Sequence, residues 1–308
     1  MEKHKSVLLD EAIYYLNIKE NGIYVDATLG FAGHSSEILK RIKNGYLIAF
    51  DKDIDAIKYS KGILSNIGNN FEIFNTGFIN IYDNVLTKFN KVDGILFDIG
   101  VSSVEIDEAS RGFSYMKNGP LDMRMDQNST ITAEKIINTY SLSELVFIFR
   151  EYGEEKHAYK IAKNIIEIRD KKPITTTFEL VAIIDRCYPY KEKRNSHPAK
   201  KVFQALRIEV NNELEEFKTA LYSSLDLLNV GGRLVVITFH SLEDRICKKI
   251  FKEKTTIPEI IKGMPNIDKS LLPDFKLITN KPIVPSMEEI NFNKRSKSAK
   301  LRVIERVK

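Results

Sequence analysis

The sequence has few cysteines and no long apolar run, and both absences limit what the protein can be. Only two cysteines occur among 308 residues, Cys187 and Cys247, and they lie far apart. They build neither a disulfide framework nor a metal cluster, so we expect no metal site. No stretch approaches the roughly 20 apolar residues that span a bilayer. No apolar segment of a secretory signal follows the first residues, so we expect a cytoplasmic protein without a membrane partner.

The charge is only slightly unbalanced, but its distribution is informative. Apolar residues make up 43% of the chain and charged residues 29%, with a net charge of +5. Basic residues gather in two stretches, Lys191, Lys193, Arg194, Lys200, Lys201 and Arg207 in the first, and Lys294, Arg295, Lys297, Lys300 and Arg302 in the second. A charged run is usually a solvated surface. We expect both stretches to flank one ligand crevice, which favours a polyanion as the partner.

Strand and helix patterns alternate along the first hundred residues. Strands are expected at 23–28, 46–51, 71–75 and 93–98, with helices at 35–43, 53–61 and 79–88. Helical periodicity then covers 130–190, followed by a long helix at 200–229, a strand at 231–238, a helix at 241–254, a loop at 255–288 and a strand at 301–307. This order predicts an α/β fold, a doubly wound parallel sheet. We expect one sheet domain, 1–106 and 206–308, interrupted by a helical insert at 107–205.

Residues 22–53 outline a nucleotide site. An apolar run leads into the turn Gly30-Phe-Ala-Gly33, where glycines let a ligand approach the backbone, and Ser35 can cap the following helix. A second apolar run ends on Asp51, which can accept hydrogen bonds from ribose hydroxyls. Asp51 could instead cap the next helix, although Asp53 is better placed to do so. The turn lacks the G-x-G-x-x-G pattern of dinucleotide enzymes, so it better suits S-adenosylmethionine, which has a ribose but no phosphate.

Other candidates follow the remaining strands, because ligands of open α/β sheets bind outside the carboxyl ends of the strands. Phe78 can pack on an adenine or simply fill the core. Asp98 ends an apolar run, and a buried carboxylate needs a partner. His34 and His240 also lie at this edge, where either can cap a helix rather than act as a base or a metal ligand.

Longer motifs resemble a known family. They are His4 to Glu11, Gly30 to Ser35, Asp98 to Ser103, Arg111 to Tyr115, Gly119 to Met125, His197 to Asn211, Phe239 to Arg245 and Ser296 to Arg302. Over nearly its whole length the chain resembles the RsmH (MraW) family of ribosomal RNA cytosine-N4 methyltransferases. The resemblance implies a class I, Rossmann-like methyltransferase with a substrate-recognising helical insert and S-adenosylmethionine as cofactor. It implies methylation of the N4 amine of a cytidine in the decoding region of small-subunit 16S rRNA.

The resemblance also assigns residues and partners. It places cofactor contacts on Ala32, Gly33, His34, Asp51, Phe78, Asp98 and Glu105. The family has glutamine at the last of these positions, and a carboxylate cannot donate as an amide does. The family also usually has glycine where Phe31 stands, so the Phe31 side chain must point away from the ligand. The expected partner is small-subunit rRNA or the assembled subunit, and a homodimer is left open.

The catalytic groups are less clearly marked. Many amine methyltransferases place Asn/Asp/Ser-Pro-Pro-aromatic after the fourth strand, whereas this chain has Asp98-Ile-Gly-Val-Ser102. We therefore take Asp98 and Ser102 as the catalytic candidates, with the unstacked base resting on Phe239 or Phe113. Two other functions fit the same residues. A non-catalytic RNA-binding protein would bind cofactor without transferring a methyl group, and a small-molecule methyltransferase would lack salt-dependent substrate binding.

Overall fold

The computed structural model describes residues 6–100, 103–189, 191, 197–257, 259 and 268–308. The chain divides into two compact units, which we call the sheet unit (1–100 and 214–308) and the helical unit (101–213). The sequence placed the boundaries slightly differently, after residues 106 and 205. Residues 103–106 and 206–213 are thus grouped with the helical unit. Among the described residues, no helix is long and apolar enough to cross a membrane.

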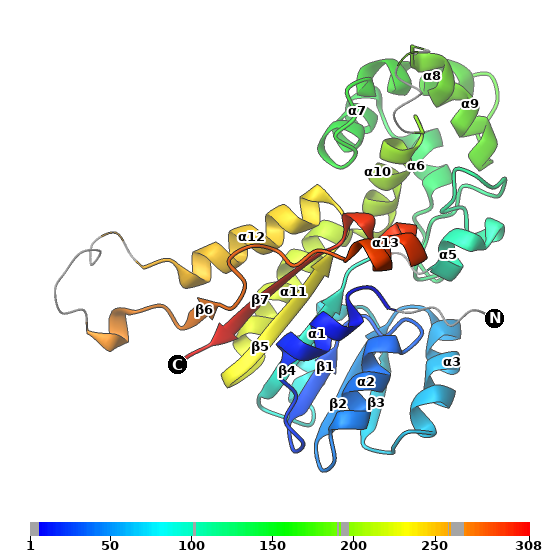
Figure 1. Cartoon of the computed structure of the whole chain (residues 1–308). Coiled ribbons are helices and arrows are strands. Elements are labelled where there is room, and N and C mark those ends of the chain that lie inside the picture. The colour runs from blue at the N-terminus through cyan, green and yellow to red at the C-terminus, as the bar shows by residue number, and fades with distance from the viewer. Residues whose placement is uncertain (1–5, 101–102, 190, 192–196, 258, 260–267) are drawn as a thin grey trace. The chain divides into compact units, whose positions relative to one another are not determined.

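Seven strands form one sheet in the order β3-β2-β1-β4-β5-β7-β6 (Figure 1). They are β1 Ile23–Asp26, β2 Tyr46–Asp51, β3 Phe71–Asn75, β4 Val92–Asp98, β5 Leu228–Thr238, β6 Phe275–Leu277 and β7 Lys300–Arg306. Strands β1 to β5 are parallel, whereas β7 runs antiparallel to both β5 and β6. The α/β doubly wound class predicted from the sequence is confirmed. The strand order reverses between β1 and β4, the switch point at which such sheets bind ligands.

Helices cover both faces of this sheet. In the sheet unit they are α1 Leu9–Leu16, α2 Gly33–Arg41, α3 Ile54–Ser65, α4 Ile81–Leu86, α11 Glu213–Leu227, α12 Ser241–Thr255 and α13 Met287–Phe292. Apolar residues on the two faces of the sheet enter two separate clusters, so that Leu47 and Ala49 of β2 belong to one and Ile48 and Phe50 to the other. Helices α1, α2 and α3 pack in the first cluster, and α4, α11 and α12 in the second.

The helical unit has its own apolar core. Its helices are α5 Ser103–Asp107, α6 Ala133–Thr139, α7 Leu142–Glu151, α8 Ala158–Arg169, α9 Thr177–Cys187 and α10 Lys200–Asn211. Capping boxes begin two of them, with Ser141 and Glu144 on α7 and Thr176 and Glu179 on α9. In each box the N-cap hydroxyl and the acid satisfy backbone N–H groups that the first turn leaves unpaired.

The structure corrects several expected elements. The long helix at 200–229 is wrong, since α10 and α11 are separated by Asn212 in a left-handed conformation at φ 49°. Asparagine adopts this conformation more readily than most residues, so it can end a helix without proline or glycine. The helix expected at 79–88 is a 3₁₀ turn, η1 Phe78–Asn80, followed by the short α4. The sequence analysis also missed α1, and it missed β6 within the segment predicted to be a loop.

Asn211 generates a prediction about the helical unit. Its Oδ1 accepts from Met125 N at 2.8 Å, and its Nδ2 donates to Met123 O at 2.8 Å and to Arg207 O at 2.9 Å. Asn211→Ala should lower the unfolding free energy by about 2–3 kcal/mol, because buried backbone groups lose their partners. Denaturant titration of this variant should be compared with that of Asn128→Ala, an exposed residue of the same unit. Equal denaturation midpoints for the Asn211→Ala and Asn128→Ala variants would contradict the stabilising role assigned to Asn211.

Candidate functional site

The turn after β1 is shaped by backbone conformation and by close packing. Gly30 and Ala32 both have left-handed φ values, +49° and +60°, and Ala32 is the N-cap of α2. A side-chain carbon at Gly33 would lie 1.9 Å from Ser6 Oγ, so a larger residue there would displace the Ser6 side chain. The expectation that Ser35 caps α2 is wrong because the helix begins earlier, at Gly33. Ser35 Oγ instead donates to Asp26 Oδ2 at 2.6 Å.

Asp51 ties this turn to the end of β2. Its Oδ2 accepts from Gly30 N at 2.8 Å and its Oδ1 from Asp53 N at 2.8 Å. Burial raises the pKa of Asp51, although these two backbone hydrogen bonds oppose the shift. Asp53 caps α3 by accepting from Asp55 N, so capping α3 is not the role of Asp51. The Asp51 carboxylate is therefore held in a fixed orientation at the carboxyl edge of the sheet, beside the turn.

The neighbouring side chain Phe31 points toward α3. Its ring lies edge-on to that of Tyr59, with the ring centroids 5.2 Å apart. This contact explains how a bulky residue is accommodated at a position where the resembled family usually has glycine. The turn backbone from Gly30 to Gly33 thus keeps its shape without a glycine at residue 31.

Asp98, at the end of β4, is the most perturbed carboxyl group of this edge. Its backbone N donates to Thr28 Oγ1 at 2.7 Å, and its Oδ1 has no hydrogen-bond partner among the described residues. Burial, and after it the negative charges of Asp26, Glu243 and Glu289, together raise the pKa of Asp98 to about 8. We call these four residues the acidic cluster.

The other members of the acidic cluster are held by neighbouring groups. Asp26 accepts from Thr28 N at 3.1 Å as well as from Ser35. Glu243 Oε2, in the first turn of α12, accepts from Phe239 N at 2.7 Å and from His240 N at 3.1 Å. Glu289 Oε1, on α13, accepts from Leu8 N at 2.9 Å. Each carboxylate is thereby fixed near the carboxyl ends of the strands.

The two histidines of this edge differ in position. Burial lowers the pKa of His34 to about 4, so this ring is neutral at pH 7 although its Nδ1 lies 3.5 Å from Asp98 Oδ2. His34 therefore does not neutralise the acidic cluster, which is suited to a cationic ligand. His240 occupies the N-cap position of α12, one of the two roles foreseen for it, and its Nε2 lies 2.9 Å from Glu243 Oε1.

Phe78 and Lys52 border the site on the β2–β3 side. Phe78 is partly buried, and its ring lies edge-on to Phe97 with the centroids 5.7 Å apart, so it contributes to the core while keeping some exposed surface. Lys52 Nζ pairs with Glu216 Oε2 at 2.6 Å. A side-chain carbon at Gly77 would lie 2.2 Å from Lys52 Cε, so glycine makes room for this ion pair.

Two further sequence-predicted residues, Ser102 and Glu105, are not part of the described sheet unit. Ser102 lies outside the described residues, so its role stays a prediction. Glu105 belongs to α5 of the helical unit, where it is buried and its Oε1 lies 3.8 Å from Arg111 Nη2. Sequence analysis also missed Asp26, Glu243 and Glu289. Only Asp26 left a clear signal, an acid inside the apolar run of the first strand.

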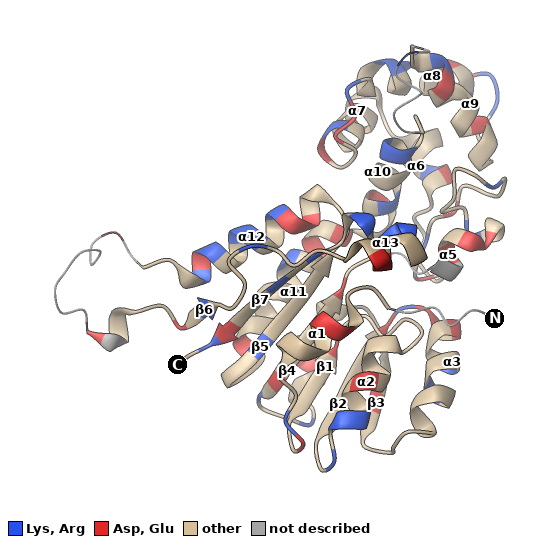
Figure 2. Cartoon of the chain, viewed as in Figure 1, with Lys and Arg blue, Asp and Glu red and all other residues tan. Residues whose placement is uncertain are grey.

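The described residues of the two basic stretches, coloured blue in Figure 2, differ in their exposure. Lys294, Arg295 and Lys297 are exposed on the 3₁₀ turn η6, Lys294–Ser298. Lys300 and Arg302 pair with Asp244 at 2.9 and 2.7 Å. In the helical unit, Lys191, Lys200 and Lys201 are exposed, whereas Arg207 pairs with Glu213 at 2.7 Å. Lys193 and Arg194 lie outside the described residues.

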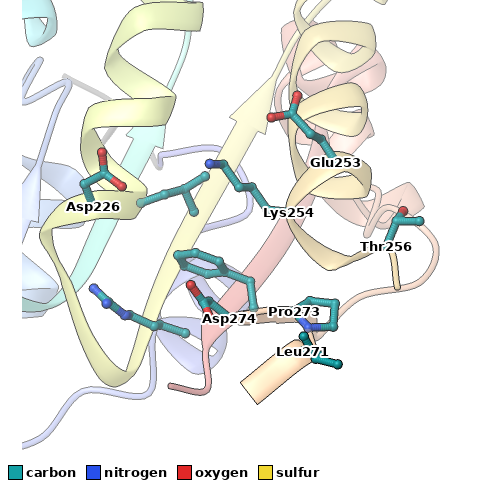
Figure 3. Close-up of a pocket in the computed structure, with 10 residues that line it drawn as sticks. Asp226, Glu253, Lys254, Thr256, Leu271, Pro273 and Asp274 are labelled. Carbon is teal, nitrogen blue, oxygen red and sulfur yellow. The ribbon is translucent and has the colours of Figure 1, made fainter. Parts of the chain in front are cut away.

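A separate pocket opens at the opposite end of the sheet (Figure 3). Its lining includes Arg306, whose Nη1 donates to the carbonyl of Leu228, the first residue of β5. Two of its acids are engaged, since Glu253 accepts from Tyr222 and Asp274 pairs with Lys308 at 3.3 Å. The pocket therefore does not belong to the site at the carboxyl ends of the strands.

The acidic cluster predicts an unusual dependence of stability on pH. Because the pKa of Asp98 is raised to about 8, the folded protein binds more protons than the unfolded chain between about pH 4 and pH 8. The contribution of Asp98 to the unfolding free energy therefore falls as the pH rises from about 4 to about 8. Asp98→Asn should raise the unfolding free energy of the ligand-free protein at pH 9 by about 1–3 kcal/mol and change it little at pH 4.

Thermal and denaturant unfolding at both pH values would measure this difference. Asp55→Asn is the matched control, since Asp55 is an exposed carboxylate on α3. The assignment of Asp98 as a destabilising buried charge fails if the Asp98 variant keeps the wild-type pH profile.

The chain is similar to known proteins over nearly its whole length. The model of the MraW methylase family matches residues 1–307. Two similar proteins are named ribosomal RNA small subunit methyltransferase H. The one from Exiguobacterium sibiricum is 48% identical, and the match covers 100% of this chain and 99% of that protein. The one from Mesoplasma florum is 53% identical, and the match covers 99% of this chain and 100% of that protein. A solved putative methyltransferase from Streptococcus mutans, in complex with SAH, is 14% identical over 99% of both chains, with a TM-score of 0.43. The chain belongs to the MraW methylase family.

Proposed function

We propose that the protein transfers a methyl group from S-adenosylmethionine to the N4 amine of a cytidine in the decoding region of small-subunit 16S rRNA. The observation that carries the proposal is the fixed Asp51 carboxylate beside an acidic cluster, at the switch point of a methyltransferase sheet. Relatives about half identical over their whole length are named for small-subunit rRNA methylation. This supports rRNA as the substrate, whereas the cytidine N4 target rests on the resemblance of the motifs.

The residues at the carboxyl edge fit S-adenosylmethionine. We assign Asp51 to the ribose hydroxyls, Phe78 to the adenine, and Ala32, Gly33 and His34 to the surface against which the ligand lies. Asp98 and its acidic neighbours suit the cationic sulfonium and amino groups, because opposite charges attract strongly where water is scarce. Glu105 remains a proposed contact from the helical unit. When bound, the cofactor supplies an electrophilic methyl group on positively charged sulfur.

The methyl acceptor needs help, because the cytosine amine shares its lone pair with the ring. Holding the amine in line with the methyl group can supply about 7–11 kcal/mol of the barrier. An acceptor beside the amine would localise the lone pair and take the proton released as the C–N bond forms and the C–S bond breaks. Asp98 suits this role, since a nearby cation lowers the pKa of a carboxyl group and so favours the carboxylate. Ser102 is the second proposed acceptor.

The substrate would be bound partly by charge. The exposed cations of η6 are suited to phosphates, and we assign substrate recognition to the helical unit, which also carries exposed lysines. Of the two aromatic residues proposed to receive the base, Phe113 is buried in the core of the helical unit. Phe239 follows β5 at the carboxyl edge and is only partly buried, so it is the better candidate.

The direct experiment is transfer of tritium from labelled cofactor to small subunits of a strain that lacks the enzyme, followed by nucleoside analysis. Label in N4-methylcytidine supports the proposal. Label in another nucleoside overturns the N4 assignment, and cofactor binding without transfer would favour a non-catalytic RNA-binding protein.

Asp51 provides a test of the cofactor site. Asp51→Ala removes a charged acceptor of the ribose hydroxyls, an interaction that contributes about 1.5–3 kcal/mol. Calorimetry should therefore show S-adenosylmethionine binding at least about tenfold more weakly. Asp53→Ala is the control, because it removes the cap of α3 and should cost about 1 kcal/mol of stability with little change in affinity. Unchanged cofactor affinity in folded Asp51→Ala would refute the ribose contact.

The cations of η6 provide a test of RNA binding. Replacing Lys294, Arg295 and Lys297 together by alanine should remove about three phosphate contacts and reduce the salt slope by roughly 0.7 per contact. The measurement is log affinity for rRNA against log salt concentration, with cofactor affinity as the internal control. A matched triple variant replaces the exposed Lys40, Lys43 and Lys58 of the sheet unit. Equal salt slopes for the wild type and the η6 variant would mean that the cations of η6 are only a solvated surface.

A further inference from the structure

We propose that Phe292, at the end of α13, is a stacking platform for an unpaired base of the RNA substrate, next to the cations of η6. This inference rests on the proposed RNA substrate and adds to it the kind of RNA that is recognised, a single-stranded segment. It also assigns the residue that receives one of the bases.

The segment around α13 exposes more apolar surface than a short solvated helix needs. Phe292 is 64% exposed, Met287 71% and Val284 58%, all within nine consecutive residues. Lone exposed apolar side chains are common on protein surfaces, whereas contiguous ones mark interaction sites, so this segment is a candidate for such a site. The exposed Lys294, Arg295 and Lys297 follow directly, so the apolar and cationic side chains lie on one continuous stretch of chain.

This surface is held rigidly. Ile283 and Leu301 exchange backbone hydrogen bonds of 2.9 and 2.8 Å, which attach the start of the segment to β7. Ser286 caps α13 by accepting from Glu289 N, and Ser296 Oγ donates to Asn293 O at 2.8 Å. Phe292 is therefore presented by backbone that already has its final shape, and binding a base would cost little ordering entropy.

The surface also lies at the edge of the sheet that carries the candidate site. Strand β7 begins at Lys300, which pairs with Thr238, the last residue of β5. Glu289 of α13 belongs to the acidic cluster around Asp98 and is hydrogen-bonded to Leu8. Phe292 is only three residues beyond Glu289, so a strand of RNA on this surface is close to the site of methyl transfer.

An aromatic face beside phosphate-binding cations matches the chemistry of an unpaired nucleic-acid strand. Such proteins stack bases on aromatic rings and bind the backbone with lysine and arginine, and every base offers a face for stacking. A duplex keeps its bases stacked on one another and leaves none free for Phe292. A cytosine amine also has to be unpaired before it can accept a methyl group, so one single-stranded segment would satisfy both requirements.

The test compares the affinity of the full-length protein for a single-stranded oligoribonucleotide and for the same sequence in a duplex, by fluorescence anisotropy. Phe292→Ala should weaken single-strand binding about tenfold and leave duplex binding unchanged. Phe292→Trp should retain wild-type affinity, whereas Phe292→Leu, which keeps an apolar side chain without a ring, should bind like the alanine variant. Tyr14→Ala is the matched control, since Tyr14 is a 75% exposed aromatic residue on α1.

The possible outcomes distinguish failure of the stacking role from failure of the proposed methyl transfer. Wild-type affinity in Phe292→Ala, or in Phe292→Leu, overturns stacking by Phe292. If Phe292→Ala binds naked RNA normally but assembled subunits weakly, the surface contacts a ribosomal protein and the inference is again overturned. Suppose that the wild type transfers no methyl group to cytidine, but that the Phe292→Ala variant binds the single strand more weakly than the wild type does. The proposed reaction then fails while the stacking role stands. Unchanged cofactor affinity verifies that each variant is folded.

Discussion

Four carboxyl groups gathered at one edge of the sheet are the constraint on which the rest of the site depends. The negative charges of Asp26, Glu243 and Glu289 disfavour the ionised form of Asp98, and the neutral His34 does not compensate them. The four carboxyl groups stay together because hydrogen bonds from the backbone and from Ser35 hold three of them, and because two apolar clusters fix the strands and helices that carry them. The protein thereby holds negative potential where a cationic cofactor would bind.

Much of this arrangement was predictable from local sequence. Apolar runs ending on Asp51 and Asp98 located β2 and β4, and parallel strands necessarily bring their carboxyl ends to one edge. The members of the acidic cluster that come from outside these runs were not predictable. Glu243 and Glu289 reach Asp98 only through the pairing of β5 with β4 and β7, which no local pattern encodes.

The errors in secondary structure have physical causes. Ser35 has the residue type of a cap, but a left-handed Ala32 starts α2 earlier and leaves the Ser35 hydroxyl to bond Asp26. The break at Asn212 between α10 and α11 interrupts a run whose apolar periodicity looks continuous, because asparagine tolerates a conformation that periodicity does not register. The three-residue β6 owes its existence to pairing with β7 rather than to its own composition.

The hydrogen bond between Leu8 and Glu289 has a consequence for synthesis of the chain. It joins residues near the two ends of the sequence, and the pairing of β4 with β5 likewise waits for the whole helical unit to be made. Parallel pairings between distant segments form slowly. A nascent chain emerging from the ribosome would therefore present β1 to β4 well before its acidic edge is complete. The acidic edge should gain its full affinity for a cationic ligand only when β5 and β7 have joined the sheet.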